Sequence, residues 1–175
     1  TSTHDPGKTD DDNWRLVTVT AQAVVSATKS SSVSTVGPNG VIQYTMSLVN
    51  TGNQPTIPLS FSKIDKDGDA AFDTASGLFV KDPIPTGLAI TGDASVDFPP
   101  TQRSDVISLY GYMNGNWSVD GNVHAWGGTA AVESVGWLFV GSLLQGQTVE
   151  LSWNAKTLPI SPADKIANVA TVTWG

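Results

Sequence analysis

An acidic loop gives the sequence its most pointed chemical feature. Oxygen-bearing side chains stand at the first, third, fifth and ninth positions of the stretch DKDGDAAFD, and these residues are Asp65, Asp67, Asp69 and Asp73. Calcium loops carry ligands at these spacings. Ala70 stands where an EF-hand has glycine, and Ser76 where it has a bidentate glutamate. We therefore predict a Ca²⁺ site of another class; the alternative is a solvated acidic hairpin.

A second candidate chemistry would join two distant parts of the chain. Lys29 lies in an early strand pattern and Asn168 in the last one. They resemble the lysine and asparagine of intramolecular isopeptide bonds, which also need a buried carboxylate such as Glu150 or Asp82. The alternative is an asparagine that hydrogen-bonds the backbone at a turn.

The six tryptophans suggest a sugar-binding surface, because a flat aromatic face suits the C–H side of a pyranose. Trp137 and Trp153 fall in strand patterns and are predicted core residues. Trp117 and Trp126 lie in a stretch rich in glycine and asparagine, so they are the candidate ligand-binding residues. Asn116 opens an N-x-S sequon and is a candidate glycosylation site.

The sequence does not favour catalysis. It contains no nucleophile elbow, HExxH motif or P-loop, and its two histidines, His4 and His124, are far apart. Because the chain has no cysteine, it has neither disulfides nor thiolate metal ligands. We expect that the protein is not an enzyme.

Alternation of apolar and polar residues at a period of two dominates the chain and predicts strands. In the strand that follows the GPNG turn, Ile42, Tyr44, Met46 and Leu48 are predicted to share one face. Strands are predicted at 14–33, 41–50, 56–64, 76–84, 88–98, 105–113, 116–121, 132–141, 147–156 and 168–174, with one helical turn near 161–166. Many short strands with Gly, Pro, Asn or Asp in the gaps indicate an all-β sandwich or barrel.

Several short sequence motifs, taken in order along the chain, resemble those of a known family. They are ATK at 27–29, GPNG at 37–40, YT at 44–45, NTGN at 50–53, KDPIPTGL at 81–88, NGNWS at 114–118, VGW at 135–137, GSL at 141–143, GQ at 146–147 and IANVATVT at 166–173. The set resembles the immunoglobulin-like conserved repeat domain of bacterial and archaeal surface and cell-wall proteins, a family long catalogued as a domain of unknown function. The resemblance implies a mostly antiparallel immunoglobulin-like β-sandwich over 23–175 and supplies no catalytic residues.

Charge and hydropathy limit the kinds of partner and the cellular location that we expect for the protein. The net charge is −7 and the nine basic residues never cluster, so we expect no nucleic-acid partner. No apolar run reaches the ~18 residues that a membrane span requires. The chain begins at Thr1 rather than methionine, which favours a mature N-terminus left by removal of a signal sequence. We expect an extracellular or cell-surface protein.

Residues 1–22 are predicted to form an extended N-terminal arm. Its polar beginning leads into a stretch with Trp14, Leu16, Val17 and Val19, which are the candidate subunit-interface residues. Such an arm could add a strand to a sheet edge of another copy, giving a pilus-like filament built head to tail by β-strand donation. The C-terminal strand is a second candidate donor, and Arg15 to Thr20 could instead pair within their own domain. A surface adhesion or stalk module and a glycan-binding module are the alternative functions.

Overall fold

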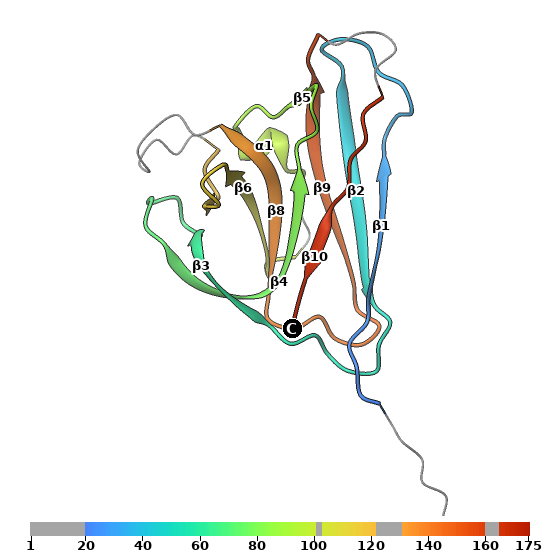
Figure 1. Cartoon of the computed structure of the whole chain (residues 1–175), viewed down its shortest axis with the longest axis vertical. Helices are drawn as coiled ribbons and strands as arrows, with labels where there is room; N and C mark the ends of the chain where they lie inside the picture. Colours follow the sequence, from blue (N-terminus) through green and yellow to red (C-terminus); the bar gives the residue numbers. More distant parts are fainter. Residues whose placement is uncertain (1–19, 101–102, 122–130, 160–164) are drawn as a thin grey trace, which may run out of the picture.

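Two β-sheets packed face to face make up the part of the chain that the structure describes (Figure 1). The structure is a computed structural model that describes residues 20–100, 103–121, 131–159 and 165–175. The first sheet contains, in spatial order, β1 (Val25–Ser31), β2 (Val41–Asn50), β9 (Thr148–Thr157) and β5 (Leu88–Ala89). The prediction of an all-β sandwich is confirmed.

The second sheet has six strands and closes on itself. It contains β3 (Leu59–Asp65), β4 (Asp73–Pro83), β6 (Val106–Tyr112), β7 (Trp117–Ser118), β8 (Val132–Val140) and β10 (Thr171–Thr173). Antiparallel pairings run from β3 to β4, β8, β6 and β7, and a parallel pairing returns from β7 to β3. These five strands therefore form a closed ring, with β10 attached to the outer edge of β4.

The alternating pattern of β2 places its apolar face between the two sheets, as predicted. Ile42, Tyr44, Met46 and Leu48 are all buried, and the residues between them are not. The partner strand β9 alternates in the same way. Tyr44 lies opposite Trp153 and stacks on it at a ring separation of 5.2 Å. Cross-strand aromatic pairs of this kind stabilise a sheet and fix its register.

A second, smaller core fills the closed ring. Its buried members are Ile64, Ala75, Phe79, Leu109 and Leu138. Strand β4 contributes to both cores, because Leu78 and Val80 face the other sheet and Phe79 faces the ring. This explains why the sequence of β4 does not alternate: a strand that is buried on both faces needs apolar residues in succession.

One predicted strand is wrong. Residues 88–98 form only the two-residue β5, a loop and the short helix α1 (Ala94–Asp97). Asp93 caps this helix by accepting a hydrogen bond from the Ser95 N–H, and the Asp97 carboxylate accepts the N–H groups of Thr91 and Gly92. Side-chain hydrogen bonds to nearby backbone compete with strand pairing, and this local chemistry overrides the apolar pattern. Within the described residues, no helix has the length and apolarity needed to span a bilayer.

Two predicted segments extend outside the described residues. They are residues 14–19 of the first strand and residues 160–164 around the predicted helical turn near 161–166. The other predicted strands each have a counterpart, although β7 and β10 are shorter than predicted.

The close approach of β4 to β8 gives a test of the packing. A Cβ at Gly77 would lie 2.0 Å from the backbone oxygen of Phe139, whereas a Cβ at Gly37 would have no atom within 4 Å. We expect Gly77→Ala to lower the free energy of unfolding by about 2 kcal/mol, because backbone atoms cannot move aside cheaply. The control Gly37→Ala should change it by less than about 1 kcal/mol. Urea denaturation followed by tryptophan fluorescence measures both, and equal losses would contradict the described contact.

Candidate functional site

A lysine and an aspartate meet inside the edge of the sandwich. Lys29 of β1 lies opposite Met46, whose side chain is buried, so position 29 faces the core. Asp82 is on the same face of β4 as Val80, and its side chain is fully buried. The Lys29 Nζ lies 2.6 Å from both carboxylate oxygens of Asp82. Two charged groups thus occupy positions where the strand alternation calls for apolar residues.

Aromatic residues hold this ion pair in place. The Trp153 indole Nε1–H donates to Asp82 Oδ2 at 2.6 Å. The ring of Tyr44, which stacks on Trp153, lies 5.2 Å from the Lys29 ammonium and makes a cation–π contact with it. Asp82 therefore accepts hydrogen bonds from two donors, Lys29 on β1 and Trp153 on β9, and these are the two strands that flank β2.

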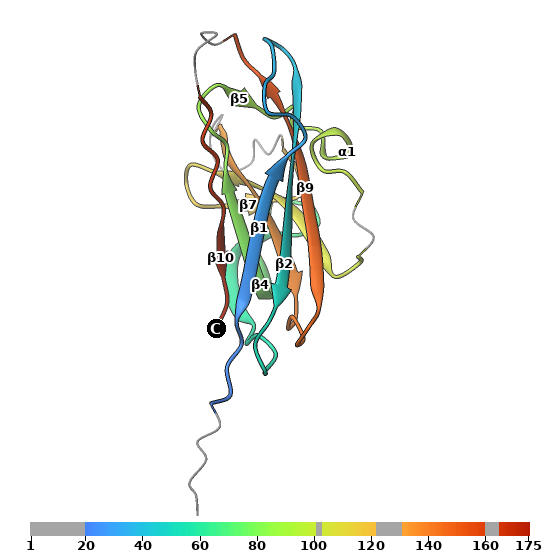
Figure 2. The same ribbon diagram turned by 90° about the vertical axis from the view of Figure 1, so that its right-hand side faces the viewer.

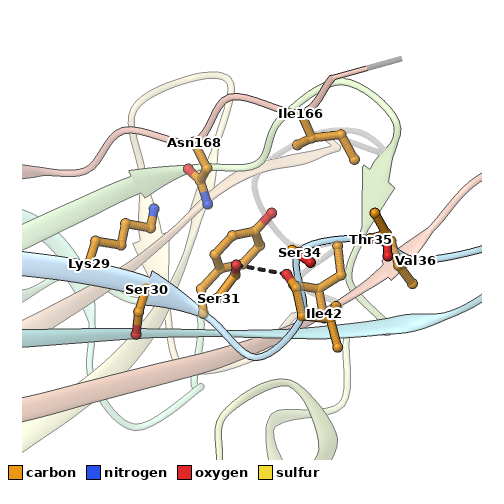
Figure 3. Close-up of a pocket in the computed structure, with 11 residues that line it drawn as sticks. Lys29, Ser30, Ser31, Ser34, Thr35, Val36, Ile42, Ile166 and Asn168 are labelled. Carbon is orange, nitrogen blue, oxygen red and sulfur yellow. Dashed lines mark hydrogen bonds between the residues drawn. The ribbon is translucent and has the colours of Figure 1, made fainter. Parts of the chain in front are cut away.

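Asn168 completes the group from the other sheet. It lies three residues before β10 and has the same inward-facing parity as Ala170 and Val172, which pack on the core. Both polar atoms of its side chain are buried, and neither has a hydrogen-bond partner among the described residues. Figure 3 shows the side chains of Lys29 and Asn168 extending from different chain segments toward the same space. A buried amide left without partners costs roughly 1–3 kcal/mol.

A hollow of about 460 Å³ lies where these residues come together. Lys29, Tyr44 and Asn168 line it, together with Ile42 and Ile166 (Figure 3). The hollow is partly open to solvent and is bordered by the end of β1 and by residues 33–36 of the loop that follows it. A small molecule such as ammonia or water can therefore reach or leave the buried group.

The surroundings perturb two of the titratable groups. Burial lowers the pKa of the Lys29 amine below its ordinary value; the hydrogen bond and charge of Asp82 oppose this shift without cancelling it. Burial, and then the charge of Asp82, raise the pKa of the Tyr44 hydroxyl. The amine is thus easier to deprotonate than an exposed lysine.

The structure decides between the two carboxylates that the sequence offered. Glu150 is exposed on the outer face of β9, opposite Ser47, and so takes no part in the group. Asp82 is the one that meets Lys29. Sequence reasoning placed Trp153 in the core but missed its bond to Asp82; the usable signal was that a buried indole N–H needs an acceptor.

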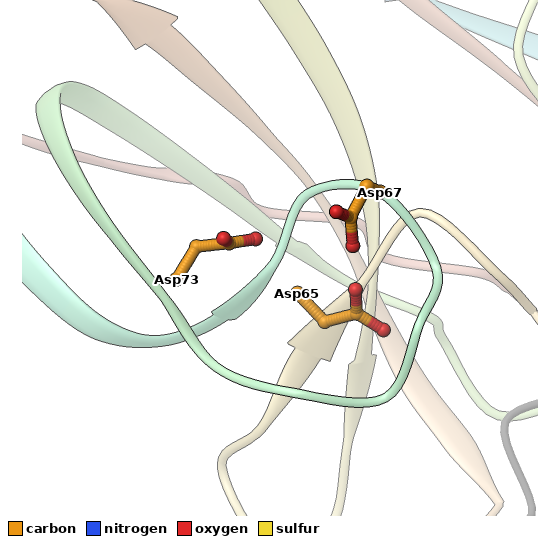
Figure 4. Close-up of side chains that lie close together, drawn as sticks. All are labelled: Asp65, Asp67 and Asp73. Carbon is orange, nitrogen blue, oxygen red and sulfur yellow. The ribbon is translucent and has the colours of Figure 1, made fainter.

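Three of the four predicted calcium ligands lie close together. Carboxylate oxygens of Asp65, Asp67 and Asp73 lie within 4.8 Å of one another (Figure 4). Asp69 is not part of this cluster, and its carboxylate accepts the N–H of Ala71. Carboxylate oxygens are the ligands that Ca²⁺ prefers. Binding of calcium here stays a prediction.

The same loop is held by its own hydrogen bonds. The buried Asp65 carboxylate accepts the N–H groups of Gly68 and Ala70 and the hydroxyl of Ser118. Burial alone would raise the pKa of Asp65, but these hydrogen bonds together outweigh it and hold the pKa below its usual value. Ala70 has a φ of 65°, in the left-handed region, so the Asp65 bond supports a strained turn.

Trp117 is packed rather than presented as an open face. Its ring meets Phe79 edge to face at 4.8 Å and covers Gly111 and Gly136, where an added Cβ would collide with it. This position does not favour stacking on a sugar. Asn116 is partly exposed in the turn before β7, and its glycosylation stays a prediction.

The remaining candidate residues lie outside the described residues. They are Trp126 of the ligand-binding pair and Trp14, Leu16, Val17 and Val19 of the predicted interface.

Comparison with models of protein families, with curated proteins and with solved structures found no match to this chain. The family resemblance therefore stays a prediction that rests on its motifs.

The lowered pKa of Asp65 predicts a pH-dependent contribution to stability. Asp65→Asn should lower the free energy of unfolding by about 2 kcal/mol at pH 7, because an amide NH₂ would oppose the N–H donors of Gly68 and Ala70. A depressed folded-state pKa stabilises above the unfolded value of about 3.9 and is lost as the pH falls through the folded value. The difference in the free energy of unfolding between wild type and variant should therefore be smaller at pH 3. Urea titrations at both pH values measure it, and a constant gap would contradict the assignment.

Calcium at the acidic loop can be tested separately. We expect millimolar Ca²⁺ to raise the thermal unfolding midpoint, with a gain of about 1.4 kcal/mol at ten times the dissociation constant. Asp67→Asn should abolish the rise, because Asp67 belongs to the carboxylate cluster. Asp69→Asn, outside the cluster, is the matched control and should keep it. Identical calorimetric scans with calcium and with a chelator would refute the site.

Proposed function

We propose that the protein is a structural subunit of an extracellular surface filament, in which one copy donates a β-strand to the next. The observation that carries the proposal is the free strand edge along β9. Filament subunits need a way to join identical copies in one direction, and a strand donated to an open edge does this through main-chain hydrogen bonds.

One edge of β9 lacks a strand partner over most of its length among the described strands. On one side β9 pairs with β2 from Thr148 to Lys156. On the other side, within the described residues, it pairs with β5 only at Lys156 and Thr157. Figure 2 shows β1, β2 and β9 side by side. Every second residue from 148 to 155 thus directs its N–H and C=O groups away from β2, with no strand partner among the described strands. The helix α1 packs against β9, and the Asn154 side chain donates to the Val96 C=O. A strand edge without a strand partner is a template for another strand.

The opposite edge of the sheet is less suited to receive a strand. Strand β1 pairs only with β2 among the described strands. The ion pair between Lys29 and Asp82 ties β1 to the second sheet, and Lys29 of β1 lines one hollow with Asn168 of the segment before β10. We therefore assign β9 as the receiving strand.

The position of Thr20 supports donation by the N-terminal arm. The residues next to Thr20, 21–23, line one hollow together with Trp174 and Gly175, so the first described residues lie beside the C-terminus. Asn53 anchors the chain there, because its side chain bonds the Gln22 N–H and the Thr20 C=O. Residues 1–19 join the sandwich at this end, where a copy stacked end to end would lie. Donation does not need any of the described contacts to break.

The alternatives are distinguishable. An adhesion or stalk module uses the same sandwich without polymerising, and a glycan-binding module needs an exposed aromatic face. The packed position of Trp117 does not favour the second alternative. A charged-residue content of only 14% and the absence of catalytic motifs suit a structural protein at the cell surface.

Removing the arm tests strand donation. We expect the full chain to form regular fibres at neutral pH in electron micrographs, and a chain lacking residues 1–19 to remain a folded monomer. This deletion leaves the contacts of Asn53 with Thr20 and Gln22 in place. Fibres that persist after the deletion would exclude the arm as donor and favour the C-terminal strand.

Single substitutions sharpen the same test. Val17→Asp should abolish fibres, because a carboxylate in an apolar pocket costs several kcal/mol. Ser2→Asp places the same charge in the polar beginning of the arm, away from the four interface residues, and is the matched control. Monodisperse single domains for the unaltered chain would contradict the filament and favour an adhesion module.

A further inference from the structure

The group formed by Lys29, Asp82 and Asn168 is not explained by stability. A buried ion pair contributes little net free energy, since the desolvation of both charges offsets their attraction. The Asn168 amide adds a cost, because its buried atoms have no partner among the described residues. Three apolar side chains would fill these core-facing positions more favourably. An arrangement that costs stability indicates a chemical role.

We propose that Lys29 and Asn168 become joined by an intramolecular isopeptide bond between Nζ and Cγ, formed by the protein itself with Asp82 as the proton-transfer group. The inference concerns covalent modification within one chain. It does not depend on whether copies assemble.

The reaction balances without any added reagent. A proton passes from the Lys29 ammonium to the Asp82 carboxylate, leaving a neutral amine and a carboxylic acid. The amine attacks the Asn168 Cγ, while Asp82 gives its proton to the amide oxygen as that oxygen gains negative charge. Asp82 then carries a proton from Nζ to the amide nitrogen. Ammonia leaves as the oxygen returns its proton to Asp82 and the C=O bond forms again, so Asp82 ends as the neutral acid. One C–N bond forms, one breaks, and no electrons are gained or lost.

The contacts of Asp82 fit this role. Its two oxygens both lie 2.6 Å from Nζ, which is a suitable distance for proton transfer. The Trp153 N–H holds one of these oxygens and fixes the orientation of the carboxyl group. Burial lowers the pKa of the Lys29 amine, so its neutral form is more accessible than that of an exposed lysine.

Asn168 is placed as an electrophile rather than as a structural amide. The alternative considered from the sequence was an asparagine that hydrogen-bonds the backbone at a turn, but neither of its side-chain atoms makes such a bond in the described part of the chain. The amide is aimed into the space that the Lys29 amine also enters (Figure 3). The adjoining hollow of about 460 Å³ gives the released ammonia a way out.

Mass spectrometry of the intact folded chain tests the proposal directly. We expect the measured mass of the native protein to be lower than the mass calculated from its sequence by one ammonia. After trypsin digestion, residues 166–175 should be attached through Asn168 to a peptide that spans residues 16–63 and is uncut at Lys29. A chain at its full sequence mass after folding would overturn the proposal.

Three variants separate the roles of the residues. Lys29→Arg keeps a cation beside Asp82 but removes the nucleophile, and Asp82→Asn keeps the shape but removes the proton carrier. Asn168→Ala removes the electrophile and leaves the ion pair of Lys29 with Asp82 intact, so it should fold even if the other two do not. All three should have the full sequence mass. Lys81→Arg, next to Asp82 but partly exposed, is the matched control and should lose ammonia as the native chain does.

One side reaction must be distinguished from the cross-link. Asn39 and Asn114 each precede a glycine and can lose ammonia by closing a succinimide ring. That loss would persist in Lys29→Arg and would give no linked peptide. A loss of ammonia that survives Lys29→Arg, or a digest without the linked pair, would refute the isopeptide bond.

Discussion

Burial of β4 on both faces is the constraint on which the rest of this structure depends. Its residues Leu78 and Val80 fill the space between the sheets, while Phe79 fills the closed ring. The same strand pairs with β3, β8 and β10, so three pieces of the chain take their positions from it. Asp82 lies near the end of this strand, and the rigidity of its surroundings lets a buried carboxylate be held at a fixed place. The site is therefore a product of the core rather than of a flexible loop.

The sequence was sufficient to predict a strand that has one buried face. The alternation at 41–50 gave the bounds and the inward face of β2 correctly, because a period of two has only one structural meaning there. It failed at 88–98, where the apolar residues indicated a strand but Asp93 and Asp97 bind local N–H groups and form a short helix. It also gave no sign that the second sheet closes on itself, because the parallel pairing of β7 with β3 joins segments more than fifty residues apart.

Part of the candidate site could likewise be predicted from the sequence. Lys29 and Asn168 could be singled out by residue type and by their places near the two ends of the sandwich domain. The choice of Asp82 over Glu150 could not be made, because it depends on which face of each strand is buried and on which strands lie across the core. The hydrogen bond from Trp153 was hidden for a similar reason: it links β9 to β4 in the opposite sheet, and no local pattern records a contact between sheets.

The positions of the described chain ends have a mechanical consequence. Thr20 and Gly175 lie at one end of the sandwich (Figure 1), and β1 and β10 both extend away from that end. Tension applied between these two residues would peel β1 from β2 and β10 from β4 one hydrogen bond at a time, which offers less resistance than shearing whole strands. Separation of β1 from β2 would reach Lys29, and separation of β10 from β4 would reach Asn168. The proposed bond between these two side chains would pass the force directly from one outer strand to the other, bypassing the chain between them.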